Sequence, residues 1–302
     1  MVLGAARVRV PEDHRIGKIE LPGNWFLNLL YETKPDQKKH FVIQGVKVLS
    51  GGDWFKIIDS KNSDEALVFV HGYNTSFDDS LYRMAQIIWD LQYHGVAVLY
   101  SWASRGKLLS YSYDRESVLI DSSNFIELLK MLETEHGIRH VHVLAHSMGN
   151  LLVMDALRDQ AKLPNPVKVS ELVMAAPDVD RDFFTMNAPQ IRKITAGMTL
   201  YASAADKALV ISRRLAGGIP RAGDVPPEGP IVLPQLDSID VTAVGSDLFG
   251  LDHDTFAGTR SVMTDIHALL TDDPRRLPNL RSVEIRGVPE GMSIPRYFRF
   301  SE

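Results

Sequence analysis

Short apolar runs alternate along the chain with longer stretches whose apolar residues recur every three or four positions. This alternation is typical of an α/β protein, in which a mostly parallel central sheet carries helices on both faces. We predict strands at 41–48, 66–70, 96–101, 141–145, 171–175, 199–202 and 239–244. We predict helices at 80–93, 115–136, 148–161, 207–215 and 260–270, where the apolar spacing is close to that of a helix.

The same pattern indicates a single domain over residues 1–272. Within it, 1–64 would supply antiparallel opening strands, and 65–272 would form the core that carries an active site. Residues 273–302 are expected to be an extension of one or two strands, over 281–288, that packs on the same domain.

Residues 216–234 interrupt the alternation with a run of glycines and prolines, which predicts a long loop. Loops of this length inside a compact domain are often lids or binding loops. Its glycines permit motion, whereas its prolines stiffen the pieces between them. A passive surface connection is an equally good interpretation.

The most informative motif is Ala145-His146-Ser147-Met148-Gly149, which directly follows a β-branched run. A serine between a strand and a helix, with small residues two positions before and after it, is typical of a nucleophile elbow. Such a turn strains the backbone of the serine and exposes its hydroxyl at the edge of the sheet. Ser147 is therefore the candidate nucleophile. The alternative is a serine that caps an ordinary strand-to-helix turn.

A second motif, H-G-Y-N at 71–74, follows the buried run 67–70. A His-Gly loop in this place can supply one backbone N–H to an oxyanion hole, and the residue after the nucleophile supplies the other. Those donors would be the N–H groups of Tyr73 and Met148. Each such donor can stabilise a developing oxyanion by roughly 3 kcal/mol. The plainer interpretation is a glycine turn with an incidental histidine.

A serine hydroxyl needs a base, and the base needs an acid to orient it. In hydrolases built on such a sheet, the base is the last of the three along the chain. Only His253 and His267 follow Ser147. His253 lies in the connection after the last core strand, whereas His267 falls inside a predicted helix, where it would pack or face water. We predict His253 as the base and regard the histidines at 140, 142 and 146 as structural.

Asp206 and Asp178 are the candidates for the acid. Asp206 is preferred because it follows the predicted strand 199–202, which is the more common position. Asp178 follows the preceding strand, where some hydrolases carry the acid. The stretch P-D-V-D, which contains Asp178 and Asp180, can instead begin a helix, with an aspartate as its N-cap. Its D-x-D spacing also resembles a metal loop, but no further oxygen ligands cluster with it, so we expect no metal site.

Composition limits the class of protein. The chain has 302 residues, of which 45% are hydrophobic and 24% charged, as in ordinary globular proteins. A net charge of -5 argues against a nucleic-acid partner. The absence of cysteine excludes disulfides and cysteine nucleophiles. Residues 1–15 lack an apolar signal core, and no apolar run is long enough to span a membrane, so we expect a cytoplasmic protein.

Taken together, the motifs resemble a bacterial branch of the α/β-hydrolases that is catalogued as a domain of unknown function. The likeness covers residues 65–272 and rests on V-F-V-H-G-Y-N-T-S-F, Y-S-W-A-S-R-G-K-L-L-S-Y-S-Y-D-R-E-S, L-A-H-S-M-G-N, A-A-P-D-V-D, L-Y-A-S-A-A-D-K-A-L and D-H-D-T-F. It implies an α/β-hydrolase fold and an esterase-type site at Ser147, Asp206 and His253. Two departures are the alanine two residues before the serine and the aspartates on both sides of the histidine.

The candidate residues predict a serine hydrolase that cleaves small carboxylic esters through an acyl-enzyme intermediate, without a cofactor. Asp252 and Asp254 place two carboxylates beside the base, and no long apolar lid is evident, so we expect a preference for short acyl groups. A thioesterase, amidase or acyltransferase would use the same triad. A non-catalytic binding protein of the same fold would usually lack one of the three residues. Trp102, Tyr111 and Tyr113 could line an acyl pocket, although packing is the more ordinary role of such aromatics.

Overall fold

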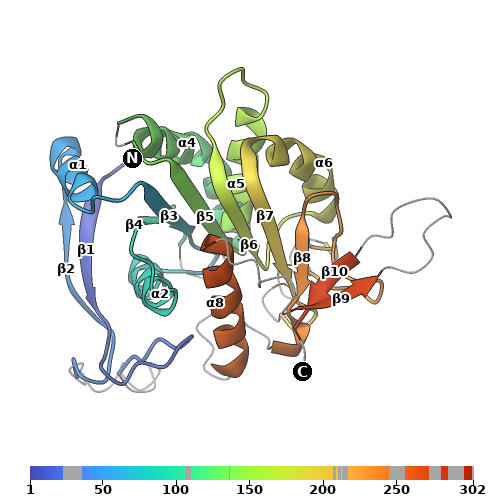
Figure 1. Cartoon of the computed structure of the whole chain (residues 1–302), viewed down its shortest axis with the longest axis horizontal. Helices are drawn as coiled ribbons and strands as arrows, with labels where there is room; N and C mark the ends of the chain where they lie inside the picture. The colour runs from blue at the N-terminus through green and yellow to red at the C-terminus, as the bar shows by residue number, and fades with distance from the viewer. Residues whose placement is uncertain are drawn as a thin grey trace.

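A sheet of eight strands, in the order β4-β3-β5-β6-β7-β8-β10-β9, runs through the centre of the molecule (Figure 1). The computed structural model describes residues 1–22, 36–105, 110–135, 137–206, 209, 212, 217–244, 256–271, 280–284 and 296–300. The strands of the sheet are β3 (Glu65–Val70), β4 (Val96–Tyr100), β5 (His140–His146), β6 (Val169–Ala175), β7 (Thr195–Ala202), β8 (Asp237–Asp240), β9 (Arg281–Glu284) and β10 (Arg296–Arg299). All neighbours are parallel except the edge pair of β9 and β10, which is antiparallel. The predicted mostly parallel sheet is confirmed.

Helices cover both faces of the sheet, as the sequence predicts. Side chains of α1 (Gly51–Asp59), α3 (Tyr111–Ile120), α4 (Ser122–Lys130), α5 (Gly149–Gln160) and α6 (Arg181–Ile191) share one buried cluster with one set of strand residues. Those of α2 (Phe77–Asp90) and α8 (Phe256–Leu270) share a second cluster with the alternate set. In Figure 1, α8 crosses in front of the sheet. Alternation of side chains along each strand supplies both apolar layers.

The two opening strands do not join the central sheet. β1 (Gly4–Arg9) and β2 (Val42–Val48) form their own antiparallel ribbon, at the opposite end of the molecule from β9 and β10 (Figure 1). The predicted strand at 41–48 is confirmed as β2, and β1 and β2 are antiparallel but do not open the central sheet. The C-terminal extension does add two strands, and β10 pairs with β8.

Several predicted boundaries were wrong for local reasons. The single helix predicted over 115–136 is α3 and α4 with a π-helical turn at Met131–Glu135, and the break falls in the polar run Asp121-Ser122-Ser123. Short polar side chains bond to nearby groups in place of the helical ladder, and the Ser122 hydroxyl donates to Asp155 of α5 at 2.9 Å. The last core strand ends at Asp240, not at 244, because the Asp240 carboxylate accepts the N–H of Thr242 at 3.0 Å and turns the chain.

Among the described strands and α-helices, β1, α1, α6 and β10 lie outside the predicted ranges. α1 is short, and two glycines in its first turn weaken its helical pattern. The feature of the sequence that marks this helix is its N-cap residue Ser50, whose hydroxyl accepts the N–H of Asp53 at 3.2 Å. α6 contains Pro189, which weakens any helical pattern. Of the helix predicted at 207–215, only Leu209 and Ser212 lie within the described residues.

A buried histidine ties the N-terminal segment to α2. His14 contacts Glu20 through Nδ1 at 2.9 Å and Asp90, the last residue of α2, through Nε2 at 2.8 Å. Its side chain is 3% exposed, and that of Asp90 is fully buried. Burial by itself lowers the pKa of His14, but the hydrogen bonds and charges of Asp90 and Glu20 outweigh it and raise the pKa to about 9. The folded protein therefore favours the charged imidazole.

This contact predicts a loss of stability at alkaline pH. Because the folded-state pKa lies above the unfolded value of about 6.5, the stabilisation is complete below pH 6.5 and disappears as the pH rises through about 9. We expect the wild type to lose about 3 kcal/mol of unfolding free energy across this window through His14. Urea unfolding at several pH values measures it. The His14→Gln protein should lack this pH-dependent part, whereas an exposed control, His94→Gln, should keep it; equal pH dependence in all three proteins would contradict the assignment.

Candidate active site

Ser147 occupies a strained turn between β5 and α5. Its φ is +50°, a left-handed conformation that a residue with a side chain adopts only when its surroundings impose it. The surroundings here are hydrogen bonds: the Ser147 N–H donates to the carbonyl of Ala175 at 3.0 Å, and its own carbonyl accepts the N–H groups of Asn150 at 3.1 Å and Asp178 at 3.2 Å. The Asn150 side-chain amide donates to the carbonyls of Ala145, Ser147 and Ala175. The predicted elbow is therefore present.

Two glycines allow the connection after β3 to pack directly against this turn. A Cβ atom at Gly149 would lie 2.6 Å from the carbonyl oxygen of His71, and one at Gly72 would lie 2.9 Å from the Cβ of Ser147. Neither distance is sterically possible, so both positions require glycine. Ala145, where the usual motif has glycine, is fully buried in β5, and the alanine is accommodated within the strand.

The connection after β3 is held by His71 and Trp102. The two rings stack with centroids 5.2 Å apart, and the Trp102 indole N–H donates to the His71 carbonyl at 2.8 Å. His71 also contacts Ser101 through Nε2 at 3.2 Å. Burial lowers the pKa of His71, so the ring is neutral near pH 7. His71 therefore holds the connection after β3 in place, and this connection places Tyr73 next to the turn at Ser147.

The two predicted oxyanion donors come from the two sides of this contact. Tyr73 directly follows Gly72, which touches Ser147, and its ring packs edge-to-face on Tyr111 with centroids 5.4 Å apart. Met148 is the N-cap residue of α5, and its N–H lies at the positive end of the helix dipole. The structure thus places both residues at the elbow.

Asp206 lies at the same edge of the sheet, since it follows β7, two strands along from β5. Its side chain is buried, and its Oδ1 accepts the N–H of Leu209 at 3.0 Å. This bond satisfies the backbone donor of Leu209.

Asp178 belongs to a buried ion pair that the sequence did not suggest. Asp178 and Arg221 are each 1% exposed, and the Arg221 Nε lies 3.1 Å from the Asp178 Oδ1. The same oxygen accepts the hydroxyls of Tyr111, at 3.2 Å, and of Ser212. Burial raises the pKa of Asp178, and the charge of Arg221 opposes that rise. Because Oδ1 already accepts two hydroxyls and lies beside the Arg221 charge, Asp178 has a structural role beside the elbow. Arg221 lies in the glycine- and proline-rich segment, where no motif marks it.

The neighbouring Asp180 is the N-cap of α6, as the alternative interpretation of P-D-V-D predicts, and it accepts the N–H of Phe183 at 2.8 Å. Of the three aromatics suggested for an acyl pocket, Trp102 and Tyr111 are buried in the core cluster. Tyr113 is exposed, with the guanidinium of Arg105 3.8 Å above its ring.

The predicted loop after Asp206 is fixed near the elbow. Residues 217–236 contain no helix or regular strand. However, the N–H groups of Ala222 and Gly223 donate to the carbonyls of Val179 and Pro177 at 2.8 and 3.0 Å. The loop therefore runs beside the segment after β6, and a lid that swings at Gly223 is not what the structure shows.

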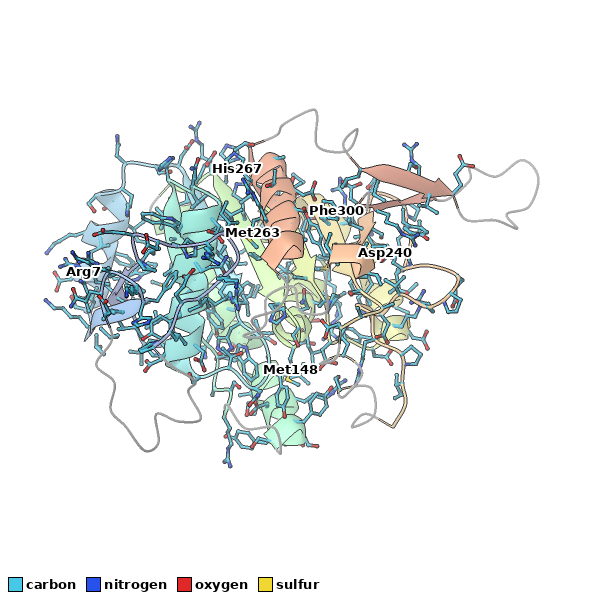
Figure 2. All side chains as sticks on the ribbon, turned by 90° about the horizontal axis from the view of Figure 1, so that it is seen from below. Arg7, Met148, Asp240, Met263, His267 and Phe300 are labelled. Atoms are coloured by element: carbon cyan, nitrogen blue, oxygen red, sulfur yellow. The ribbon has the colours of Figure 1, made fainter. Side chains whose placement is uncertain are left out.

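The predicted base, His253, and its flanking Asp252 and Asp254 lie outside the described residues. His267 is exposed on α8, where its Nδ1 contacts the carbonyl of Leu91 at 2.8 Å. Figure 2 shows it on the opposite side of the sheet from Met148, so it does not face the elbow.

The earlier histidines are part of β5. His142 is buried, and burial is the main reason that the pKa of His146 falls to about 3, so His146 stays neutral. Within the described ranges, no three His, Asp or Glu side chains are grouped to hold a metal ion. No helix in the described part of the chain is long and apolar enough to cross a membrane.

Comparison with known proteins gives the family. No curated protein matches the chain. Among solved structures, an esterase from Pyrococcus furiosus is similar at 12% identity with a TM-score of 0.42, over 86% of this chain and 98% of that one. A lipase-esterase related protein from Clostridium acetobutylicum is similar at 12% identity with a TM-score of 0.33, over 70% of this chain and 95% of that one. The model of a family described as alpha/beta hydrolase of unknown function matches residues 50–272. The strained serine between β5 and α5, the sheet order and this match together establish that the chain belongs to that α/β-hydrolase family.

Proposed function

We propose that this protein is a carboxylesterase-type serine hydrolase with Ser147 as the nucleophile. The observation that carries the proposal is the left-handed backbone of Ser147 at the carboxyl edge of the sheet, against the glycine-bearing connection after β3. A left-handed backbone at a serine costs folding free energy, and such strain is found mainly at functional sites. In α/β-hydrolases the strained turn presents the serine hydroxyl to the substrate. The alternative of a simple capping serine does not account for this conformation, since a helix N-cap normally has extended backbone.

In the proposed reaction, the Ser147 Oγ attacks the acyl carbon of a small ester while His253 takes the hydroxyl proton. Asp206 orients His253 and stabilises the imidazolium. The carbonyl oxygen becomes an oxyanion held by the N–H groups of Tyr73 and Met148. The C–O bond to the alcohol then breaks, and His253 returns the proton to the alcohol. Water, activated by the same histidine, releases the acid from the acyl-enzyme and restores the serine.

The same residues would serve a thioester, an amide or an acyl acceptor other than water, because the acyl-enzyme step is common to all four reactions. A non-catalytic binding protein is a different class. The experiment that separates it is labelling with a fluorophosphonate, which reacts only with an activated serine. A stable adduct located on Ser147 would support an enzyme, and an unreactive protein would favour the binding role.

Replacement of Ser147 by alanine tests the nucleophile. Ser147→Ala should lose about 10⁴-fold or more in kcat on p-nitrophenyl butyrate, with an unchanged unfolding midpoint, because the backbone contacts of the turn remain. Ser122→Ala is a matched control, since Ser122 bonds to Asp155 between α4 and α5. A Ser147→Ala enzyme with a tenth of the wild-type rate would refute the mechanism.

Substitution of the two aspartates distinguishes the acid. Asp206→Asn should lower kcat by about 10³-fold to 10⁴-fold with little change in KM, because the base loses its orienting carboxylate. Asp178→Asn should instead lower the unfolding free energy by about 3–5 kcal/mol, because it leaves the Arg221 charge buried without its partner. Steady-state kinetics and urea unfolding of both variants measure these effects. The opposite pattern would transfer the role of acid to Asp178.

We also propose a preference for short acyl groups. The buried ion pair of Asp178 and Arg221 lies close to the elbow, and Asp252 and Asp254 flank the proposed base in the chain. A polar, charged surrounding does not reward burial of a long alkyl chain. Across p-nitrophenyl esters, kcat/KM should be highest for acetate to butyrate. A steady rise to palmitate would show that the acyl pocket is apolar.

A further inference from the structure

The C-terminal strand β10 lies beyond the part of the chain that matches the family, yet it belongs to the sheet that carries the site. It pairs in parallel with β8, with Arg299 in register with Asp240. β8 ends at Asp240, which Figure 2 labels on the same side of the molecule as Phe300. A side chain of β10 can thus contact the last residue of β8.

Arg299 holds the Asp240 carboxylate. Its Nε donates to the Asp240 Oδ2 at 2.9 Å, and its Nη2 lies 2.7 Å from the same oxygen in an ion pair. The Asp240 side chain is 2% exposed, whereas that of Arg299 is 40% exposed. A buried carboxylate needs a charged partner and further hydrogen bonds, so the position of Asp240 depends on Arg299.

The other carboxylate oxygen of Asp240 binds Thr242, so the position of Thr242 depends on that of Asp240. The Asp240 Oδ1 accepts the backbone N–H of Thr242 at 3.0 Å and its hydroxyl at 2.5 Å. Because the hydroxyl donates to Asp240, its oxygen is free to accept, and it accepts the N–H of Ala204 at 2.9 Å. Each bond in such a chain polarises and orients the next one.

Ala204 lies in the short connection between β7 and Asp206. Two other bonds hold this connection: the Ser203 N–H donates to the carbonyl of Gly223 at 2.9 Å, and the Ala205 N–H donates to the Ser203 hydroxyl at 3.1 Å. The Ala204 N–H bond to Thr242 joins the connection to the residues after β8, and it lies next to the backbone bond from the Val241 N–H to the carbonyl of Ala202, the last residue of β7, at 2.9 Å. Ala204 is exposed, so its N–H could bond to water instead. The bond to Thr242 therefore adds little to the free energy of unfolding, and its main effect is to determine the position of the connection.

We propose that Arg299, through Asp240 and Thr242, is a positioning residue for the acid Asp206. The inference rests on the proposed function, because it assumes that Asp206 orients the base. It also gives the C-terminal extension a role in catalysis that the family segment alone does not contain. A small displacement of a catalytic group, by about 1 Å, can reduce turnover by up to about 100-fold.

Kinetics of four single variants and one double variant test this series of hydrogen bonds. Arg299→Gln and Thr242→Val should each lower kcat on p-nitrophenyl butyrate by about 10-fold, with KM within about 2-fold, because positioning and not substrate binding is lost. Thr242→Ser keeps the hydroxyl and should restore most of the rate. Arg296→Gln is the charge-matched control on the same strand, since Arg296 is exposed and near Phe298 rather than Asp240. The double variant Arg299→Gln/Thr242→Val should be no slower than the slower single variant, because both act in one chain.

Amide hydrogen exchange provides a readout that does not depend on activity. The Ala204 N–H should exchange faster in Arg299→Gln and Thr242→Val than in the wild type, and at the wild-type rate in Arg296→Gln. Faster exchange with unchanged kcat in an active enzyme would overturn the positioning role and leave the proposed function intact. Unchanged exchange and unchanged kcat would overturn the chain of bonds itself. A wild type that neither hydrolyses the ester nor reacts with fluorophosphonate would overturn the proposed function, and the catalytic role of Arg299 would fall with it.

Discussion

The contact between the turn at Ser147 and the connection after β3 is the constraint on which the site depends. β3 and β5 are adjacent and parallel, so their carboxyl ends lie side by side. The chain leaves β3 toward β4 on one side, whereas β6 lies on the other side of β5. At such a reversal of strand order, the connections diverge and leave room for a ligand. Glycine at 72 and 149 lets the two connections touch at this point.

Buried charges then determine the course of the irregular chain around the elbow. Arg221 and Asp178 come from connections far apart in the sequence, and neither charge can be buried without the other. Their pairing holds the glycine- and proline-rich segment against the residues that follow β6. Composition alone left a lid and a passive surface connection equally open at this place. A glycine supplies mobility only where the backbone is not otherwise hydrogen-bonded, and here the N–H groups of Ala222 and Gly223 are bonded.

Polar contacts also attach the two ends of the chain to the core. His14 connects the N-terminal segment to α2 between two carboxylates, and Arg299 connects β10 to the end of β8. In both cases a cation meets a carboxylate that is almost fully buried. The cost of burying an unpaired carboxylate makes each contact specific, because no arrangement that separates the pair keeps the carboxylate satisfied. Charge pairing therefore joins both segments outside the family match to it, and strand pairing with β8 also joins the C-terminal one.

The sequence by itself determined the α/β architecture, because runs of apolar residues identify buried parallel strands and helical spacing identifies the helices that cover them. It also located the elbow at Ser147, since the small residues around a tight turn are adjacent in the chain. The sequence pattern did not predict short or irregular elements such as α6, because tertiary packing stabilises them more than helix propensity does. Only the tertiary structure decided that Asp178 pairs with Arg221 and that Arg299 reaches Asp240. Those partners lie far apart in the sequence, and they become neighbours only after the strands are ordered in the sheet.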